Sequence, residues 1–361
     1  MNKTTSKQHL MKDILKKGVS YLLFPLSLIW DALYRVRRFS YNFGLLKKRT
    51  FEVPIISVGN VTFGGTGKTP FSIWLAEYLA SLDKKVMILM RGYKGRLENK
   101  SGILRTGKKL GFSPFEFGDE ALLLARRLKK ASVVVGKKRS DNLEYYFPSE
   151  NSDVVLLDDG HQHLQLDRNL NIVLFDSLMD LSQYKLAPCG YMREGFTALR
   201  DADFVVLGRA DQASSQQLEG LKNLIRPHLR QCVPFAEIGY SATGLYDINF
   251  SKVMEAKELK GAKAICVAGV ASPESFFNLV DSFGADILER YSYPDHYFFN
   301  ANDVKSLIKE AEELEAIILT TEKDMVKLRK VTEYPNLLYL GIDVCFWKGE
   351  KELKDRILDV L

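Results

Sequence analysis

The strongest chemical signal in the chain is a glycine-rich segment at residues 57–70, which reads SVGNVTFGGTGKTP. An apolar run precedes it and a helical pattern follows, so we expect a strand, a turn and a helix. Glycines let successive backbone N–H groups point at phosphate oxygens, and a helix N-terminus adds partial positive charge. Lys68 would then reach the β- and γ-phosphates of a nucleotide, and the Thr69 hydroxyl would bind Mg²⁺. The alternative is a purely structural turn.

This segment departs from the common phosphate-loop pattern at one position. The pattern GxxxxGK[ST] has a glycine five residues before Gly67, where this chain has Thr62. Two glycines inside the loop, Gly64 and Gly65, accompany that change. The residues expected to bind phosphate are Thr62, Phe63, Gly64, Gly65, Thr66, Gly67, Lys68 and Thr69.

A second acidic element lies at residues 154–163, which read VVLLDDGHQH. Four apolar residues end in Asp158 and Asp159, and Gly160 turns the chain. In phosphate-loop enzymes a carboxylate at the end of a neighbouring strand holds the metal or its water. Adjacent carboxylates repel each other unless a cation such as Lys68 compensates, so a solvated turn is the alternative. His163 is either a ligand contact or an incidental loop residue.

The elements that must hold these residues alternate along the chain after Thr50. Short, wholly apolar β-branched runs are separated by helical stretches, which predicts an α/β fold with a parallel sheet covered on both faces. The expected strands are 53–58, 85–90, 132–135, 154–158, 172–175 and 204–207, and the expected helices include 70–82 and 120–128.

A second series begins near residue 264. Its expected strands are 264–267, 287–291, 316–319 and 337–340, and its expected helices are 273–283, 301–314 and 350–361. The segment 234–250 has neither pattern. We therefore expect an N-terminal helix at 1–50 attached to a first α/β domain at 51–234. A linker with some extended pairing at 235–250 would lead to a smaller C-terminal α/β domain at 251–361.

The positive charge of the chain is concentrated at its N-terminus. The whole chain has a net charge of +6, but residues 1–50 contain eleven Lys or Arg and two Asp, a net of +9, which leaves −3 for the rest. This distribution is unlike a nucleic-acid footprint, so we expect no nucleic-acid partner. The four cysteines are far apart, which fits reduced cytosolic thiols rather than zinc or disulfides.

The N-terminal segment has the composition of a helix that lies on a membrane surface. Its uncharged stretch, residues 18–30, is shorter than the ~20 apolar residues that cross a bilayer. Pro25 is expected to kink the helix or to start a new one. Apolar residues near helical spacing, flanked by basic ones and anchored by Trp30 and Tyr34, predict contact with an anionic membrane surface. The apolar set is Leu10, Ile14, Leu22, Leu26, Ile29 and Leu33, and the basic set is Lys12, Lys16, Lys17, Arg35, Arg37 and Arg38. The alternative is a helix packed on the protein's own core.

The order of the motifs resembles that of the tetraacyldisaccharide 4'-kinase family, the lipid A 4'-kinases of Gram-negative bacteria. GNVTFGGTGKTP is similar to the phosphate loop of that family. The blocks that follow in the same order are RGYKG (91–95), GDE (118–120), DDGHQH (158–163), RE (193–194), RAD (209–211), PDHY (294–297) and TTEKD (320–324). Each block alone is weakly specific, but the ordered set covers nearly the whole chain.

The resemblance implies transfer of the γ-phosphate of ATP, with Mg²⁺, to the 4'-hydroxyl of a tetraacylated glucosamine disaccharide 1-phosphate. The product would be the 1,4'-bisphosphate lipid A precursor, lipid IVA. It also implies a P-loop NTPase-like sheet with a smaller C-terminal α/β domain. The location implied is peripheral, on the cytoplasmic face of the bacterial inner membrane. The sequence does not fix the oligomeric state, for which a monomer is the expectation.

The resemblance also changes the reading of several residues. Taken alone, Asp119 is an N-cap aspartate and His296 a surface-loop residue. The resemblance makes Asp119 the catalytic base, paired with His296 when the domains close, with Lys68 as the third catalytic residue. It implies Thr69, Asp158 and Glu194 as metal ligands and Arg193, Gln162 and His163 as further nucleotide contacts. Tyr93 and Asp159 are expected to line the substrate cleft.

Two residues depart from the family pattern. His161 stands where the family usually has phenylalanine, which we expect to change packing, and Gly195 stands where it usually has proline, which would loosen that loop. The block at 320–324 has no role that the sequence gives. Two alternative functions stay open: a membrane-attached NTPase used as a switch or for targeting, and a lipid-binding protein with a vestigial phosphate loop.

Overall fold

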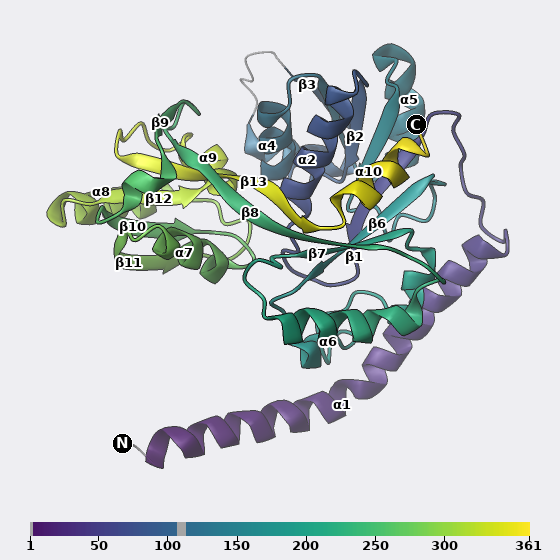
Figure 1. The fold of residues 1–361 in the computed structure, drawn as a ribbon, viewed down its shortest axis with the longest axis horizontal. Coiled ribbons are helices and arrows are strands. Elements are labelled where there is room, and N and C mark those ends of the chain that lie inside the picture. The colour runs from purple at the N-terminus through teal and green to yellow at the C-terminus, as the bar shows by residue number, and fades with distance from the viewer. Residues whose placement is uncertain (1–2, 107–112) are drawn as a thin grey trace.

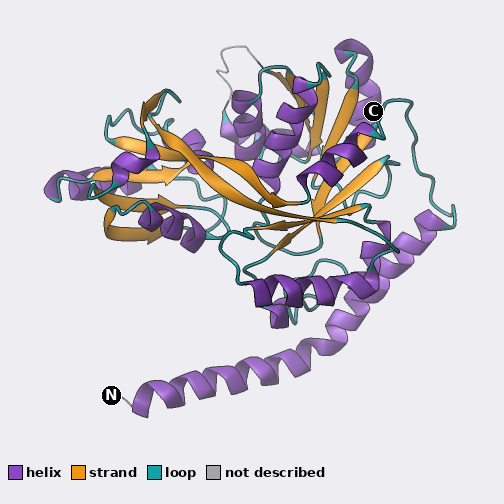
Figure 2. Cartoon of the chain, in the orientation of Figure 1, coloured by secondary structure: helices purple, strands orange, loops and turns teal. Residues whose placement is uncertain are grey.

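One mainly parallel sheet runs through the structure, which is a computed structural model. It describes residues 3–106 and 113–361, and in the N-terminal helix α1 it describes side chains from residue 23 onward. Thirteen strands of the described residues join this sheet (Figures 1 and 2). They are β1 Ile55–Asn60, β2 Val86–Met90, β3 Gly102–Arg105, β4 Ala131–Val135, β5 Val154–Asp158, β6 Leu170–Asp176, β7 Phe204–Gly208, β8 Phe235–Tyr246, β9 Lys252–Met254, β10 Lys263–Ala268, β11 Asp286–Ser292, β12 Ile317–Thr321 and β13 Leu337–Lys348. The α-helices are α1 Lys3–Asn42, α2 Lys68–Ser81, α3 Pro114–Phe117, α4 Asp119–Arg127, α5 Arg139–Glu150, α6 Ser215–Ile225, α7 Pro273–Ser282, α8 Ala301–Glu313, α9 Glu322–Leu328 and α10 Glu350–Leu358.

Strand β1 lies between β5 and β6 and pairs with both in parallel. The register puts Val58 beside Asp158, so the end of β1 and the acidic end of β5 meet at one edge. Carboxyl ends of parallel strands form the usual ligand crevice of such sheets. The topology therefore brings the glycine-rich segment and the acidic pair together, as the α/β alternation predicts.

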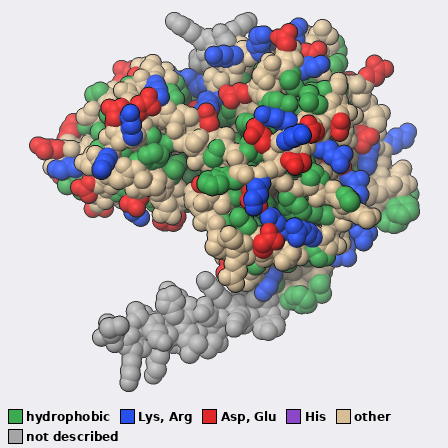
Figure 3. All heavy atoms as spheres, viewed as in Figure 1, with side chains coloured by type: hydrophobic (Ala, Val, Ile, Leu, Met, Phe, Trp, Pro, Cys, Tyr) green, Lys and Arg blue, Asp and Glu red, His purple; other side chains and the backbone are tan. Residues whose placement is uncertain are grey.

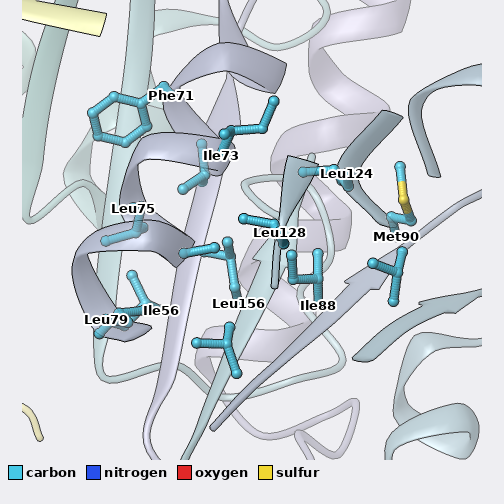
Figure 4. Packing of buried hydrophobic residues seen from close by; sticks show 14 of the residues in the cluster. Ile56, Phe71, Ile73, Leu75, Leu79, Ile88, Met90, Leu124, Leu128 and Leu156 are labelled. Carbon is cyan, nitrogen blue, oxygen red and sulfur yellow. The ribbon is translucent and has the colours of Figure 1, made fainter. Parts of the chain in front are cut away.

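The two faces of this sheet bury separate apolar clusters, because successive side chains of a strand point to opposite sides. Ile56 packs with Leu75 of α2 on one face (Figure 4). Ile55 belongs to the cluster of Leu143 from α5 on the other. Burying one such side chain fully contributes about 1.5–3 kcal/mol. Covering both faces explains why the strands are continuously apolar.

Strands β8 and β13 form a long antiparallel ribbon between the two series of elements. Figure 1 shows the ribbon running from the body with β1 to the lobe with α7 and α8. β8 occupies most of the segment 235–250, which the sequence leaves without a regular pattern. β13 also extends eight residues beyond the expected strand end at 340. Much of this ribbon is partly exposed, and its mixed polarity hides a strand from sequence patterns.

The C-terminal lobe repeats the α/β plan on a smaller scale. Strands β10, β11 and β12 are parallel, and β12 also pairs with β13 in parallel. Phe277 of α7 and Leu307 of α8 lie in two different buried clusters, one on each face of these strands.

The last helix returns to the first series. Gly349 ends β13 with φ +77°, and α10 then runs back along the body. Leu353 and Ile357 are fully buried in the same cluster as Ile56 and Leu75. The chain therefore completes its first core with its last residues.

Helix α1 is continuous from Lys3 to Asn42 with Pro25 inside it, so of the two alternatives expected for Pro25, a kink or a new helix, the new helix is excluded. Figure 1 shows that the helix changes direction part-way along. Among the described residues, no helix has the length and apolar composition needed to cross a membrane. The side chains of Leu10, Ile14, Leu22, Lys12, Lys16 and Lys17 lie outside the described residues.

The described part of α1 has a buried edge and an exposed apolar edge. Ser27, Asp31 and Arg38 are buried against the body, whereas a second set of side chains faces outward. That exposed apolar set consists of Phe24, Leu26, Leu28, Ile29, Trp30, Leu33, Val36 and Phe39. Over the rest of the molecule, acidic and basic side chains are interspersed on the face in Figure 3.

Candidate active site

The glycine-rich segment forms the end of β1, a loop and the first turn of α2. Gly67 is the N-cap of α2 with φ +79°, a conformation that L side chains rarely adopt. A Cβ at this position would lie 1.7 Å from Tyr240 Oη. Both the backbone conformation and the close approach therefore require glycine immediately before Lys68.

A cavity of about 940 Å³ opens beside this loop. The loop supplies one wall with the residues from Phe63 to Pro70. Tyr34 of α1 contributes from the N-terminal helix, and Tyr93 follows β2. Glu120 of α4 and His296 complete the wall opposite. The cavity thus brings both halves of the chain to one place.

Two loop threonines, Thr62 and Thr66, have buried side chains. Thr62 forms a β-bridge with Met192, and its buried Oγ1 has no hydrogen-bond partner among the described residues. Thr66 Oγ1 accepts a hydrogen bond from Asn60 Nδ2 at 3.1 Å. Phe63 is exposed, and the Arg193 guanidinium lies 5.3 Å from its ring. Residues 64–69 and the Phe63 side chain are therefore the parts of the loop that a ligand meets.

The acidic pair at the end of β5 divides into two different environments. Asp159 lies 3.5 Å from Lys68 Nζ and 2.9 Å from Arg193 Nη1. Burial alone would raise its pKa, but Lys68, Arg193 and Arg139 outweigh burial and hold the pKa below its usual value. Asp158 accepts a hydrogen bond from Ser72 Oγ of α2 at 2.9 Å.

Asp158 belongs to a set of groups that fits a Mg²⁺ ion. Burial and the nearby charges of Glu120 and Asp159 raise the pKa of Asp158 to about 6. A cation beside it would offset that repulsion. Within 3–106 and 113–361, no three His, Cys, Asp or Glu side chains form a metal cage. Mg²⁺ is typically bound by one or two carboxylates together with substrate phosphates, so Thr69 and Asp158 suit an ion that arrives with a nucleotide.

Glu194 faces the N-terminal helix. Its carboxylate is buried and forms an ion pair with Arg38 of α1, which also pairs with Asp201. One Glu194 oxygen, Oε1, has no hydrogen-bond partner among the described residues. Burial raises the pKa of Glu194, and Arg38 opposes that shift. Unlike Lys68 and Thr69, Glu194 does not line the cavity among the residues described.

The remaining residues of the DDGHQH block are held by backbone contacts. Gln162 lines the cavity and donates from Nε2 to the backbone oxygen of Asn60 at 2.7 Å. His163 is largely buried, and burial together with Arg139 and Arg168 lowers its pKa to about 3. His161 is fully buried, and its Nδ1 lies 3.1 Å from Asn171 Nδ2. The block is therefore a packed turn that presents mainly Gln162 to the cavity.

Asp119 and His296 meet across the two halves of the chain. His296 Nδ1 lies 3.0 Å from Asp119 Oδ2 and 3.1 Å from Oδ1. Asp119 is the first residue of α4, and the N-cap is Gly118, so an N-cap aspartate is the wrong interpretation. His296 has φ +60°, a conformation with a cost of about 1–3 kcal/mol for a non-glycine residue.

Two lysines of α9 lie beside this pair, and one of them, Lys323, belongs to the TTEKD block. Lys323 and Lys327, both on α9, lie close to the Asp119 carboxylate. Burial would raise the pKa of Asp119, but the hydrogen bond from His296 and the two lysine charges hold it well below its usual value. Asp119 is therefore ionised at neutral pH. Sequence patterns alone give the TTEKD block no role; the structure places Lys323 of this block beside Asp119.

Tyr93 completes the rim beside the pair. Its ring meets the His296 ring edge-on, with centroids 5.2 Å apart. The Arg91 guanidinium lies 5.7 Å from the Tyr93 ring. Tyr93 thus lies at the cavity next to His296, whereas Asp159, the other residue expected in the substrate cleft, pairs with Lys68 and Arg193.

Several residues at the cavity escaped the sequence analysis. Tyr240 of β8 supports the loop, and its buried Oη has no hydrogen-bond partner within the described chain. Arg209, from the RAD block, pairs with Asp176 at the end of β6 and donates to Ser272 Oγ of the C-terminal lobe at 2.5 Å. The RAD block was a usable signal for Arg209, but no pattern marks Tyr240.

Comparison with known proteins gives one consistent result. The sequence pattern of the family described as tetraacyldisaccharide-1-P 4'-kinase matches residues 19–361. A tetraacyldisaccharide 4'-kinase of Halothermothrix orenii is 32% identical, with 95% of this chain and 93% of the relative covered. One of Geobacter sulfurreducens is 34% identical, with 83% and 82% covered.

A solved structure agrees. The crystal structure of the "apo" form of LpxK from Aquifex aeolicus in complex with ATP superimposes with a TM-score of 0.74 at 30% identity. It covers 95% of this chain and 99% of that one. The resemblance drawn from the ordered motifs is thereby confirmed: the chain belongs to the tetraacyldisaccharide-1-P 4'-kinase family, the kinases of lipid A biosynthesis.

Proposed function

We propose that the chain binds ATP at residues 64–69 and transfers the γ-phosphate to the 4'-hydroxyl of a tetraacyldisaccharide 1-phosphate. The observation that carries the proposal is the Asp119–His296 pair. It joins the two halves of the chain at a cavity that also contains Lys68 and Thr69. The solved relative described in complex with ATP supports the choice of nucleotide.

The donor side of the reaction needs positive charge at the transferring phosphoryl group. Backbone N–H groups at the start of α2 and the Lys68 ammonium would receive the phosphates. Arg193 lies close to both Asp159 and Phe63 at the edge of the loop, where its planar guanidinium would stabilise spreading charge. A bound Mg²⁺, held by Thr69 and Asp158, would neutralise charge on the phosphate oxygens. We keep Glu194 as a candidate contributor through its unpaired oxygen.

The acceptor side needs a group that orients the hydroxyl and takes its proton. Asp119 is ionised and held by His296, so its carboxylate can accept a hydrogen bond from the incoming 4'-hydroxyl. As the bond from the hydroxyl oxygen to phosphorus forms and the bond from phosphorus to the β-phosphate oxygen breaks, the hydroxyl proton passes to Asp119. In a loose transition state this transfer is late, so a weak base suffices.

We further propose that α1 holds the enzyme on the cytoplasmic face of the inner membrane as a peripheral protein. Eight large apolar side chains of the described part of α1 face outward, and Tyr34 of the same helix lines the cavity. A lipid whose acyl chains contact that apolar face would therefore have its headgroup near the site.

The test is to incubate the protein with γ-labelled ATP, Mg²⁺ and tetraacyldisaccharide 1-phosphate in mixed micelles. We expect label on the lipid with the intact protein and at least about a hundredfold less with Asp119→Asn. Label that appears only as free phosphate would favour the NTPase alternative and contradict the proposed transfer. A lipid-binding protein with a vestigial loop would release no label at all.

A further inference from the structure

Lys323 of α9 connects the residues around the Asp119–His296 pair. Its Nζ lies 3.0 Å from Glu120 Oε1, 3.2 Å from Asp295 Oδ1 and 3.4 Å from His296 Nε2. The side chain is largely buried and lines the cavity. Burial would lower the pKa of Lys323, but Glu120, Asp119 and Asp295 outweigh it and raise the pKa above its usual value. Lys323 is therefore an ammonium group with three donor hydrogens and three neighbours.

The donor and acceptor inventory of the groups in contact with His296 favours one arrangement of its hydrogens. An ionised carboxylate only accepts, so the nitrogen facing Asp119, Nδ1, carries a hydrogen. An ammonium group only donates, so the nitrogen facing Lys323, Nε2, presents its lone pair. The imidazole between them is then neutral, with its hydrogen on Nδ1.

The other charges around His296 are of both signs, and the carboxylates among them oppose this neutral form. Asp295 Oδ2 lies 3.7 Å from His296 Nε2, and Glu120 lies next to Asp119 on α4. Lys327 pairs with Asp324 and lies 3.7 Å from Asp119 Oδ2, on the far side of the carboxylate. On the rim, Tyr93 meets the His296 ring, and Lys94 Nζ donates to the backbone oxygen of Asp295 at 3.5 Å. Of the positive groups, Lys323 is the one in contact with Nε2.

We propose that Lys323 is a positioning residue that keeps His296 neutral with its hydrogen on Nδ1, so that Asp119 stays aimed at the acceptor and available for its proton. Without the ammonium group, Nε2 is left beside the Asp295 carboxylate, 3.7 Å away, and takes up a proton. An imidazolium shared between Asp119 and Asp295 holds the Asp119 carboxylate more tightly and weakens it as a base. The inference rests on the proposed function in assuming that Asp119 receives the proton.

The experiment measures the ring nitrogens of His296 directly. The protein is labelled with ¹⁵N-histidine, His296 is assigned by its absence in His296→Gln, and spectra are recorded at pH 7.5. For the parent protein we expect one protonated and one unprotonated ring nitrogen. For Lys323→Met we expect both to be protonated. Lys323→Arg, which keeps the charge, is expected to restore the unprotonated Nε2.

Kinetics on the same proteins give the functional consequence. We expect Lys323→Met to lower kcat at least about tenfold with little change in the KM for ATP, and Lys323→Arg to recover most of that loss. Lys330→Met, at an exposed lysine just after α9, is the matched control and should leave spectra and kinetics unchanged.

Two results would overturn the inference. One is an unprotonated Nε2 in Lys323→Met, identical to the parent; the other is a hydrogen on Nε2 in the parent protein. Failure of the proposed function is distinguishable from both. If Asp119→Asn still phosphorylates the lipid, the assignment of the base is wrong, whereas the ring protonation of His296 still reports on Lys323 alone.

Discussion

Tyr240 Oη occupies the space beside Gly67 that any other residue would need for its Cβ. The distance from that Cβ to the oxygen would be 1.7 Å, whereas the distance to the ring carbon Cζ would be 3.1 Å. The clash is therefore with the hydroxyl first and with the ring only marginally. This places a residue of β8, at the ribbon joining the two lobes, directly under the phosphate loop.

The Gly67–Tyr240 contact predicts that Gly67→Ala weakens ATP binding at least about tenfold, because the loop must move and Ala strains a positive φ. Removing the hydroxyl in Gly67→Ala/Tyr240→Phe should recover part of that loss. Tyr240→Phe alone should bind ATP as the parent does, since its Oη has no hydrogen-bond partner in the described chain. Calorimetric titration with ATP measures all three. An additive double variant would refute the steric explanation.

Asp119→Asn should lower kcat by about 10²–10⁴-fold while the dissociation constant for ATP changes less than about twofold. The reason is that Asp119 pairs with His296, which lines the cavity, and has no contact with the phosphate loop among the described residues. Single-turnover phosphorylation of the lipid and direct ATP titration separate the two effects. A tenfold loss of ATP affinity would assign Asp119 to the nucleotide instead.

Asp158 predicts a pH dependence of stability in the absence of nucleotide and metal. Its pKa is raised from 3.8 to about 6 on folding, so between those values the native state holds a proton that the unfolded state has lost. Stability from this group therefore falls as the pH rises through that window and stays low above it. Asp158→Asn should raise the free energy of unfolding by about 2 kcal/mol at pH 7.5 and by less at pH 5.

Urea unfolding at the two pH values measures this difference. The matched control is Asp83→Asn, at a fully exposed carboxylate paired with Lys130, which should change stability by less than about 0.5 kcal/mol at either pH. Equal stabilisation by Asp158→Asn at pH 5 and pH 7.5 would show that folding does not raise the pKa of Asp158.

Arg38 predicts a large loss of stability. Arg38→Met leaves the buried Glu194 carboxylate and Asp201 without their common partner, at a cost of about 3–5 kcal/mol. The control is Lys309→Met, because Lys309 and its partner Glu313 are both exposed; its expected cost is below about 1 kcal/mol. Thermal and urea unfolding measure both, and similar values for the two variants would contradict the buried role of Arg38.

The exposed apolar face of α1 predicts binding to membranes. Val36→Asp and Leu33→Asp should each reduce sedimentation with vesicles of phosphatidylethanolamine and phosphatidylglycerol at least about tenfold, since each removes an inserted side chain worth about 1.5–3 kcal/mol. Leu358→Asp, at an exposed leucine of α10, is the control and should sediment like the parent. Unchanged sedimentation of all three would place the membrane contact elsewhere.

Much of the sheet could be predicted because burial on both faces leaves a plain signal. Strand β5 has the expected bounds, and β1, β4, β6 and β7 begin or end within two residues of them. Strand β3 was missed because it is a short, partly exposed antiparallel edge. The ribbon of β8 and β13 was predicted only as a linker with some extended pairing at 235–250 and a short strand at 337–340, because its half-exposed residues mix apolar and polar types.

The candidate site was only partly predictable, for a different reason. Lys68 and Thr69 are neighbours in a local pattern whose conformation follows from Gly67. Asp119 and His296 are 177 residues apart, so only the family resemblance joined them. Lys323 acts through geometry that no local pattern encodes, and Glu194 proved to be tied to Arg38 of α1. Periodicity predicts elements, but contacts between distant loops come from the assembled sheet.

The return of α10 to the first core has a consequence for folding during synthesis on the ribosome. Leu353 and Ile357 complete the cluster beneath the phosphate loop. A nascent chain from which α10 has not yet emerged therefore lacks part of that core. Everything from the ribbon to the acceptor-side lobe is synthesised before these residues emerge. The core beneath the nucleotide site is therefore complete only after the acceptor-side lobe has been synthesised. This order disfavours a truncated product that hydrolyses ATP without an acceptor.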